Sequence, residues 1–143
     1  MQWIRENALR LAWVQALLAM MGSLYFSEIR NFPPCVLCWY QRIAMYPLVI
    51  ILAWVMINRV QVWKALVLPF SVIGMLIAGY HCLLYYKILP EAIAPCTAGV
   101  SCTTQFIEYF GFITIPLLSL IAFTLITALA LVAKPKDSVT PQS

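Results

Sequence analysis

The chain has 143 residues, of which 64% are hydrophobic and 10% are charged, and its formal net charge is +4 at pH 7. A soluble globule of this composition would expose large apolar patches, so the composition excludes a soluble protein and indicates one that lives in a membrane. The positive charge requires no nucleic-acid partner, because basic residues beside membrane spans account for it.

The first predicted element is a membrane span over residues 8–27. Residues 11–27 carry no charge, and this run is longer than the apolar core of a signal peptide, which is typically about 7 to 15 residues. It also lacks a clean small-residue cleavage site, so we expect it to remain in the protein. Strand alternation is absent, and a span must satisfy its backbone polar groups internally, which favours helices throughout.

An outer loop over 28–39 leads into a second span over 40–58 through the run Pro33-Pro34-Cys35-Val36-Leu37-Cys38-Trp39-Tyr40-Gln41-Arg42. If Pro34 leads into the helix, Cys35 and Cys38 share one face and their sulfurs come within reach of a bond. The helix dipole and the guanidinium of Arg42, one turn beyond Cys38, both favour a thiolate. We therefore interpret the pair as redox-active, with a static disulfide or half of a zinc site as alternatives.

The third span, predicted over 65–86, carries His81 and Cys82 near its outer end. A titratable residue at membrane depth is a candidate functional residue, and the alternative for His81 is an interfacial histidine with a water partner. Cys82 has no evident mate and is expected to pack as a small apolar residue. A face of small residues suited to close helix packing is formed by Gly74, Ala78 and Gly79.

The second outer loop, predicted over 87–109, contains Cys96 and Cys102. A disulfide between them closes easily, because Gly99 can take the positive φ that a tight loop needs. A small exposed disulfide is better suited to exchange than to stabilising the fold. A short interfacial helix is predicted after it from aromatic residues spaced by three and four positions, namely Phe106, Tyr109 and Phe110.

The fourth span is predicted over 110–133, which completes a transmembrane domain over 1–133 followed by a flexible cytoplasmic tail over 134–143. Four spans place both termini on one side, and basic residues gather there. By the positive-inside rule both termini are cytoplasmic, and both loops with four of the five cysteines lie outside, where disulfides persist. The predicted fold is an all-α membrane protein, a bundle of four transmembrane helices.

Two exchangeable cysteine pairs on one outer face suggest an electron relay. A thiolate of a reduced partner would pass electrons to Cys96 and Cys102, and these would pass them to Cys35 and Cys38. The electrons then need an acceptor, and a lipid-soluble quinone docked near Cys38 and Arg42 would serve. His81 can hydrogen-bond a quinone oxygen or relay its protons. A zinc site built from the four cysteines is the competing use of these thiols.

The run from Cys35 to Arg42 resembles the signature of the DsbB-type thiol:quinone oxidoreductases, and the resemblance covers nearly the whole chain. The four spans, the two outer pairs and the run Gly111-Phe112-Ile113-Thr114-Ile115-Pro116 resemble the short Gram-positive branch often called BdbC. Proteobacterial members space the second cysteine pair much more widely. That departure leaves open whether the pairs exchange electrons by a large loop swing or by a short shuffle between neighbouring loops.

The resemblance implies a role for each candidate residue. Cys96 would take the mixed disulfide with a soluble or membrane-tethered thioredoxin-like thiol oxidase, and Cys102 would be its mate. Cys38 would face the quinone, with Cys35 as its partner, and menaquinone is expected rather than ubiquinone. The residues implied to lie at the quinone are Cys38, Gln41, Arg42 and His81. No metal is expected.

The sequence thus predicts a multi-pass cell-membrane enzyme, a protein-disulfide:quinone oxidoreductase with its active site on the extracytoplasmic face. Two alternatives belong to other classes. One is a four-span structural or adaptor subunit whose outer disulfides are static, and the other is a zinc-binding membrane protein with four cysteine ligands.

Overall fold

The computed structural model describes residues 2–60, 62–93, 101–102 and 114–133. Its long elements are all helices, and the described residues contain no strand. Each long helix is apolar enough to cross a membrane, the first as part of the segment Asn7–Ile29. The predicted all-α architecture with four spans is confirmed. The four helices are α1 (Gln2–Leu24), α2 (Val36–Asn58), α3 (Trp63–Tyr85) and α4 (Ile115–Val132).

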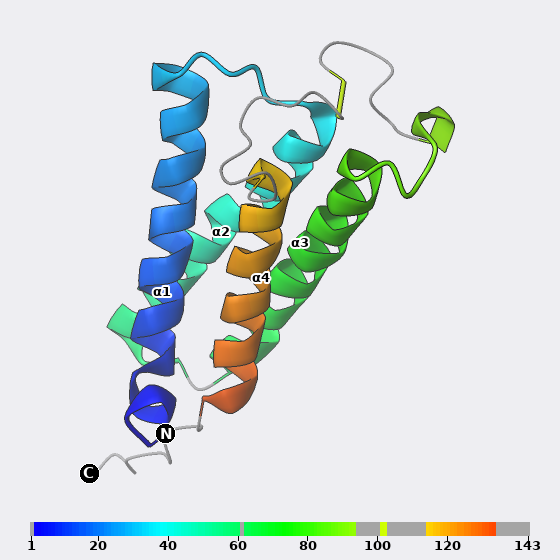
Figure 1. The fold of residues 1–143 in the computed structure, drawn as a ribbon. Coiled ribbons are helices and arrows are strands. Elements are labelled where there is room, and N and C mark those ends of the chain that lie inside the picture. The colour runs from blue at the N-terminus through cyan, green and yellow to red at the C-terminus, as the bar shows by residue number, and fades with distance from the viewer. Residues whose placement is uncertain (1, 61, 94–100, 103–113, 134–143) are drawn as a thin grey trace, which may run out of the picture.

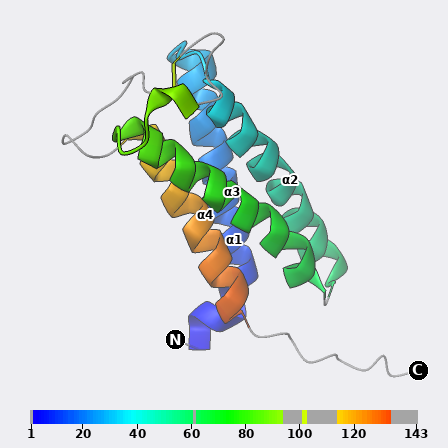
Figure 2. The same ribbon diagram turned by 90° about the vertical axis from the view of Figure 1, so that its right-hand side faces the viewer.

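The helices pack in a ring in which α1 contacts α2, α2 contacts α3, α3 contacts α4 and α4 contacts α1. Figures 1 and 2 show that α1 begins and α4 ends at the same end of the bundle. The opposite end holds the start of α2, the end of α3 and the start of α4, and we call it the cysteine end because Cys35 and Cys38 lie there (Figure 1). That the cysteine end faces outward across the membrane stays a prediction.

Two helix boundaries shape the cysteine end. Helix α1 continues into a π-helical turn, η1 (Tyr25–Ile29), and π-helical turns are frequent at functional sites. Helix α2 begins at Val36, before the predicted start of the span at residue 40, because the Cys35 sulfur caps it by accepting a hydrogen bond from the Cys38 backbone N–H. Cys38 therefore lies in the first turn of α2, and Cys35 lies just before it.

The bundle has two apolar clusters. The larger runs along the middle of the four helices and includes Leu48, Leu52, Phe123 and Ile126, all fully buried. The smaller lies at the cysteine end and is built from Cys35, Leu37, Leu84 and Cys102. Large apolar side chains also cover the outside of the bundle, as expected for helices surrounded by lipid. Among the most exposed are Ile43, Ile50, Ile57, Leu76 and Leu131.

Gly74 permits the close approach of α3 and α4. A methyl group at this position would overlap the ring of Phe123, which is fully buried on α4. We expect Gly74→Ala to destabilise the bundle by about 1 to 3 kcal/mol, because the buried ring has no room to move. Thermal unfolding in detergent, followed by circular dichroism, measures the change. Gly79→Ala is the matched control on the same helix, since a methyl there would meet only Leu120 at 4.0 Å; equal stability of the two variants would contradict the expectation.

Some predicted features lie outside the described residues. These are the interfacial helix with Phe106, Tyr109 and Phe110, the tail over 134–143 and the position of Cys96. They stay predictions.

Candidate functional site

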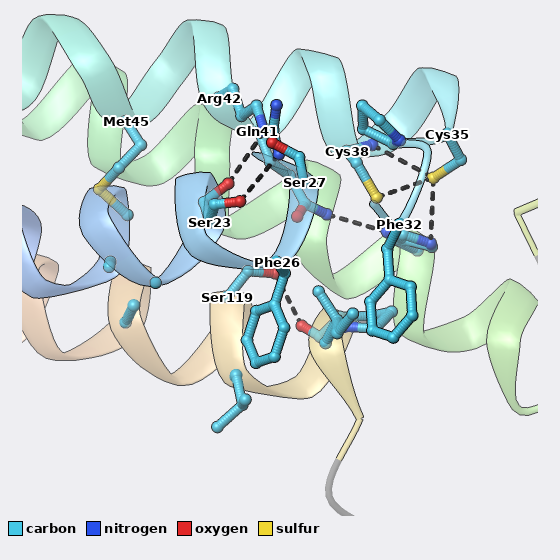
Figure 3. Close-up of a pocket in the computed structure, with 18 of the residues that line it drawn as sticks. Ser23, Phe26, Ser27, Phe32, Cys35, Cys38, Gln41, Arg42, Met45 and Ser119 are labelled. Atoms are coloured by element: carbon cyan, nitrogen blue, oxygen red, sulfur yellow. Dashed lines mark hydrogen bonds between the residues drawn. The ribbon is translucent and has the colours of Figure 1, made fainter. Parts of the chain in front are cut away.

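Cys35 and Cys38 form a close thiol pair at the start of α2. Both cysteines are free thiols, and their sulfurs are 2.9 Å apart. A disulfide bond has an S–S length of about 2.05 Å, so the two sulfurs need only a small shift to form one. Figure 3 shows the two sulfurs pointing toward one another. Cys35 is buried and Cys38 is partly buried. The pair can therefore open and close with little movement of the backbone.

The surroundings of Cys35 stabilise its thiolate. The hydrogen bond from Cys38 lowers the pKa of the Cys35 thiol from 9.0 to about 4, and His81 acts in the same direction while burial opposes it. The sequence analysis placed the charge of Arg42 beside Cys38 and did not single out Cys35. The structure adds Cys38 and His81 as the nearer influences.

This lowered pKa predicts how Cys35 reacts. We expect its alkylation in the reduced protein to proceed at a nearly constant rate from about pH 8 to about pH 6, because the thiolate persists as the pH falls. An unperturbed cysteine, with a pKa of about 8.5, slows about tenfold per pH unit below that value. Iodoacetamide labelling under anaerobic conditions, read by tandem mass spectrometry, measures the rate. In Cys38→Ala the alkylation rate of Cys35 should fall more steeply as the pH is lowered, because the hydrogen bond from Cys38 is lost. A rate that falls tenfold per pH unit in the unmodified protein would contradict the lowered pKa of Cys35.

Arg42 joins α2 to α1. Its Nε donates to the Ser23 hydroxyl at 2.9 Å and its Nη2 donates to the Ser23 carbonyl at 3.0 Å, and the guanidinium lies 5.5 Å from the centre of the Trp39 ring. Figure 3 shows Arg42 and Ser23 facing one another across the helix pair. The sequence analysis missed Ser23, whose only signal was a small polar residue within an apolar span.

His81, on α3, contacts the start of α2 and the loop segment that contains Cys102. It is 1% exposed, and its Nε2 lies 3.7 Å from the Cys35 sulfur and 3.2 Å from the Cys102 carbonyl oxygen. Its Nδ1 lies 3.1 Å from Nε2 of Gln41, which is also buried. The structure thus brings together His81, Gln41 and Cys35, and it satisfies both ring nitrogens of His81 with protein groups.

Cys102 belongs to the same neighbourhood. It is disulfide-bonded and buried, and it packs in one apolar cluster with Cys35. Its predicted mate, Cys96, lies outside the described residues. Cys82 is free and buried on α3, as expected for a small apolar packing residue.

A cavity of about 410 Å³ lies at the cysteine end (Figure 3). All four helices line it, and one side is covered by the rings of Phe26 and Phe32, which stack at 6.4 Å between centroids. Its volume lies in the range of small-molecule sites, about 300 to 1,000 Å³. Polar residues in the wall come from all four helices, and those on α2 include Cys38, Gln41 and Arg42. His81 on α3 also lines the cavity. Apolar walls are provided by Leu18, Phe26, Met45, Ile115, Pro116 and Phe123.

The site also offers donor atoms for a metal. Among the described residues, Cys35, Cys38 and His81 place one ligand atom each within 4.8 Å of one another. Two thiols and an imidazole are a donor set that a thiophilic ion accepts. The zinc site of four cysteines considered from the sequence does not fit this structure, because the sulfur of Cys102 is in a disulfide and is no thiolate ligand.

Comparisons with known proteins cover nearly the whole chain. Residues 5–133 match the model of the family described as "Disulfide bond formation protein DsbB". The chain is 51% identical to "Disulfide bond formation protein C" of Bacillus subtilis over 127 aligned residues. The alignment covers 89% of this chain and 92% of that protein. It is 41% identical over 138 residues to "Probable disulfide formation protein C 2" of Bacillus cereus, with 96% and 99% covered. It is 48% identical over 121 residues to "Probable disulfide formation protein C" of Halalkalibacterium halodurans, with 85% and 88% covered. No solved structure gives a significant match.

Proposed function

The chain belongs to the DsbB family of disulfide bond formation proteins, and from that premise we propose that it is a membrane thiol:quinone oxidoreductase. It reoxidises a thioredoxin-like thiol oxidase outside the cytoplasmic membrane and passes two electrons to a membrane quinone. The observation that carries the proposal is the free Cys35 and Cys38 pair, with sulfurs 2.9 Å apart, in the wall of an apolar cavity that also holds Arg42.

The residues present fit a quinone. A quinone head group is a flat, largely apolar ring with two carbonyl oxygens, so it needs apolar walls and few donors. The cavity supplies aromatic and aliphatic walls, the guanidinium of Arg42 and the amide of Gln41. When bound, the quinone supplies the acceptor for two electrons and two protons.

Each cysteine has a distinct part in the proposed relay. Cys96 takes the mixed disulfide with the partner oxidase, and Cys102 is its mate. The two electrons then pass by thiol–disulfide exchange to Cys35 and Cys38. Cys38 lines the cavity and is the donor to the acceptor there, while Cys35 forms the disulfide with Cys38 when the electrons leave.

Arg42 holds a fixed positive charge in the cavity wall. Its hydrogen bonds to Ser23 hold the guanidinium in place, and because the Ser23 hydroxyl and carbonyl are neutral they do not cancel its charge. This positive charge would favour the negative charge on the oxygen of a bound quinone that accepts electrons.

The structure also bears on the rival functions. A static adaptor would brace its loops with permanent disulfides, whereas Cys35 and Cys38 are free thiols held beside a cavity. The proposal also places the cysteine end outside the cytoplasm, since the thiol oxidase works there. Membrane-impermeant maleimide labelling of reduced intact cells tests that orientation.

The activity itself is tested with the purified protein, a reduced thioredoxin-like oxidase and a soluble menaquinone analogue under anaerobic conditions. We expect quinone absorbance to fall as the oxidase gains its disulfide, in a ratio of one to one. An unchanged quinone spectrum, with the oxidase still reduced, would overturn the proposal.

A further inference from the structure

Three segments far apart in sequence meet at the ring of His81. The N-cap of α2 brings the Cys35 sulfur to 3.7 Å from Nε2, and the second outer loop brings the Cys102 carbonyl to 3.2 Å from the same nitrogen. His81 itself comes from α3 and is 1% exposed. One ring nitrogen therefore contacts both cysteine pairs, in a place where water does not compete.

Gln41 sets which ring nitrogen carries the proton. Its amide nitrogen lies 3.1 Å from Nδ1 of His81, and an amide nitrogen can only donate. Nδ1 is then the acceptor, and the proton of the neutral ring is on Nε2. This N–H points to the Cys35 sulfur and the Cys102 carbonyl, both of which accept.

We propose that His81, oriented by Gln41, is a hydrogen-bonding bridge between the two cysteine pairs and stabilises Cys35 as the leaving sulfur when electrons move from the second pair to the first. This inference rests on the proposed function and assigns His81 to exchange between the pairs rather than to the quinone. His81 touches a reacting sulfur, whereas Gln41 is a positioning residue.

The step balances within the protein. Cys35 and Cys102 share one apolar cluster, so a transient disulfide between them is the short route between the pairs. The Cys102 thiolate attacks the Cys35 sulfur, so that a Cys35–Cys102 bond forms and the Cys35–Cys38 bond breaks, with Cys38 leaving as a thiolate. The thiolate of Cys96 then attacks the Cys102 sulfur, a Cys96–Cys102 bond forms, and the Cys35–Cys102 bond breaks. Its electron pair leaves with Cys35, whose thiolate accepts the hydrogen bond from His81. No outside oxidant takes part, and the second pair ends as a disulfide with the first pair reduced.

The structure has the features of the state after this step. Cys35 and Cys38 are free, Cys102 is disulfide-bonded, and the N–H of His81 faces the sulfur that has just left. The contact to the Cys102 carbonyl keeps the second loop beside the first. A short shuffle between neighbouring loops then suffices, and no large loop swing is needed.

The test uses quinone-free protein that has been given two electrons per molecule, so that one of its two disulfides is reduced. Acid quenching, alkylation and mass spectrometry give the ratio of molecules with the disulfide in the second pair to molecules with it in the first. We expect His81→Ala to lower this ratio about tenfold or more, because a hydrogen bond to a thiolate is lost. His81→Gln keeps an N–H donor and should recover part of the ratio. Gln41→Leu should shift it in the same direction as His81→Ala, but less.

Tyr80→Phe is the matched control. Tyr80 lies beside His81 on α3, and its hydroxyl donates to the carbonyl of Ile93 at 3.0 Å, so it ties the start of the same loop. The substitution removes this hydroxyl and keeps the ring that packs against the cluster of Cys35 and Cys102. If Tyr80→Phe lowered the disulfide ratio as much as His81→Ala, the effect of His81 would come only from positioning the loop, and the proposal would be overturned. So would an unchanged ratio in His81→Ala together with a raised KM for quinone, which would make His81 a quinone ligand. The ratio is read without quinone, so failure of quinone reduction in the unmodified protein would contradict the proposed function alone.

Discussion

Replacing Cys38 with serine is expected to lower thiol-dependent quinone reduction by more than about a thousandfold. Cys38 lies in the first turn of α2, one helical turn before Arg42, and both cysteines of the first pair line the cavity. A serine hydroxyl has nearly the same size, but it forms no disulfide with Cys35 and does not give up an electron pair to a quinone. The loss therefore reflects chemistry and not packing. Anaerobic quinone absorbance with the reduced oxidase as electron donor measures it.

The same variant should still react with the partner oxidase. Its second cysteine pair is intact, so a mixed disulfide with the oxidase should form and accumulate, visible on a non-reducing gel. Cys82→Ser is the matched control, because Cys82 is also a buried cysteine and does not line the cavity. Turnover of Cys38→Ser at the rate of this control would rule out the assigned role of Cys38.

Removing the charge of Arg42 is expected to have the second largest effect. Arg42→Gln should raise the KM for quinone about 10- to 100-fold, because a charge-assisted hydrogen bond is worth about 1.5 to 3 kcal/mol. Within the part of the chain that the structure describes, the guanidinium contacts Ser23 and the ring of Trp39 on the α1 side of α2. The rate of exchange between the two cysteine pairs should therefore change little. Steady-state kinetics with varied menaquinone analogue separates the two effects.

Two further variants sharpen this test. Ser23→Ala keeps the charge of Arg42 but removes the hydroxyl that holds it, and a rise in KM of only about two- to tenfold is expected for one lost hydrogen bond. Arg30→Gln removes a cation near the cysteine end that does not line the cavity, so it controls for long-range electrostatics. If Arg30→Gln raised the KM as much as Arg42→Gln, the local role of Arg42 would be refuted.

The four spans could be predicted because charge-free apolar runs reveal them directly. The boundaries were harder, since they depend on local caps. The start of α2 at Val36 depends on the Cys35 sulfur accepting the Cys38 backbone N–H, which hydropathy does not record. The π-helical turn over Tyr25–Ile29 likewise depends on its backbone hydrogen bonds, such as that from the Arg30 N–H to the Tyr25 carbonyl, and leaves no pattern in the apolar periodicity.

The closeness of Cys35 and Cys38 was predictable because it follows from helical spacing within one short segment. The contacts of His81 and Arg42 were not, because they join residues on different helices. Gln41 lines the cavity, and its role toward the quinone stays a prediction, but the contact of its amide with the ring of His81 was not predicted. Ser23 was missed because nothing in the sequence shows that it faces Arg42 across the helix pair. Such pairings depend on how the helices rotate against one another.

In the proposed reaction, the Cys35 and Cys38 pair gives its two electrons to a quinone in the neighbouring cavity. A single anaerobic turnover tests it most directly: fully reduced protein is mixed with one equivalent of menaquinone analogue, quenched in acid and alkylated. We expect one Cys35–Cys38 disulfide, found by mass spectrometry, for each quinol formed. Quinol formation that leaves both cysteines open to alkylation, or a quinone that stays oxidised beside the reduced pair, would contradict it.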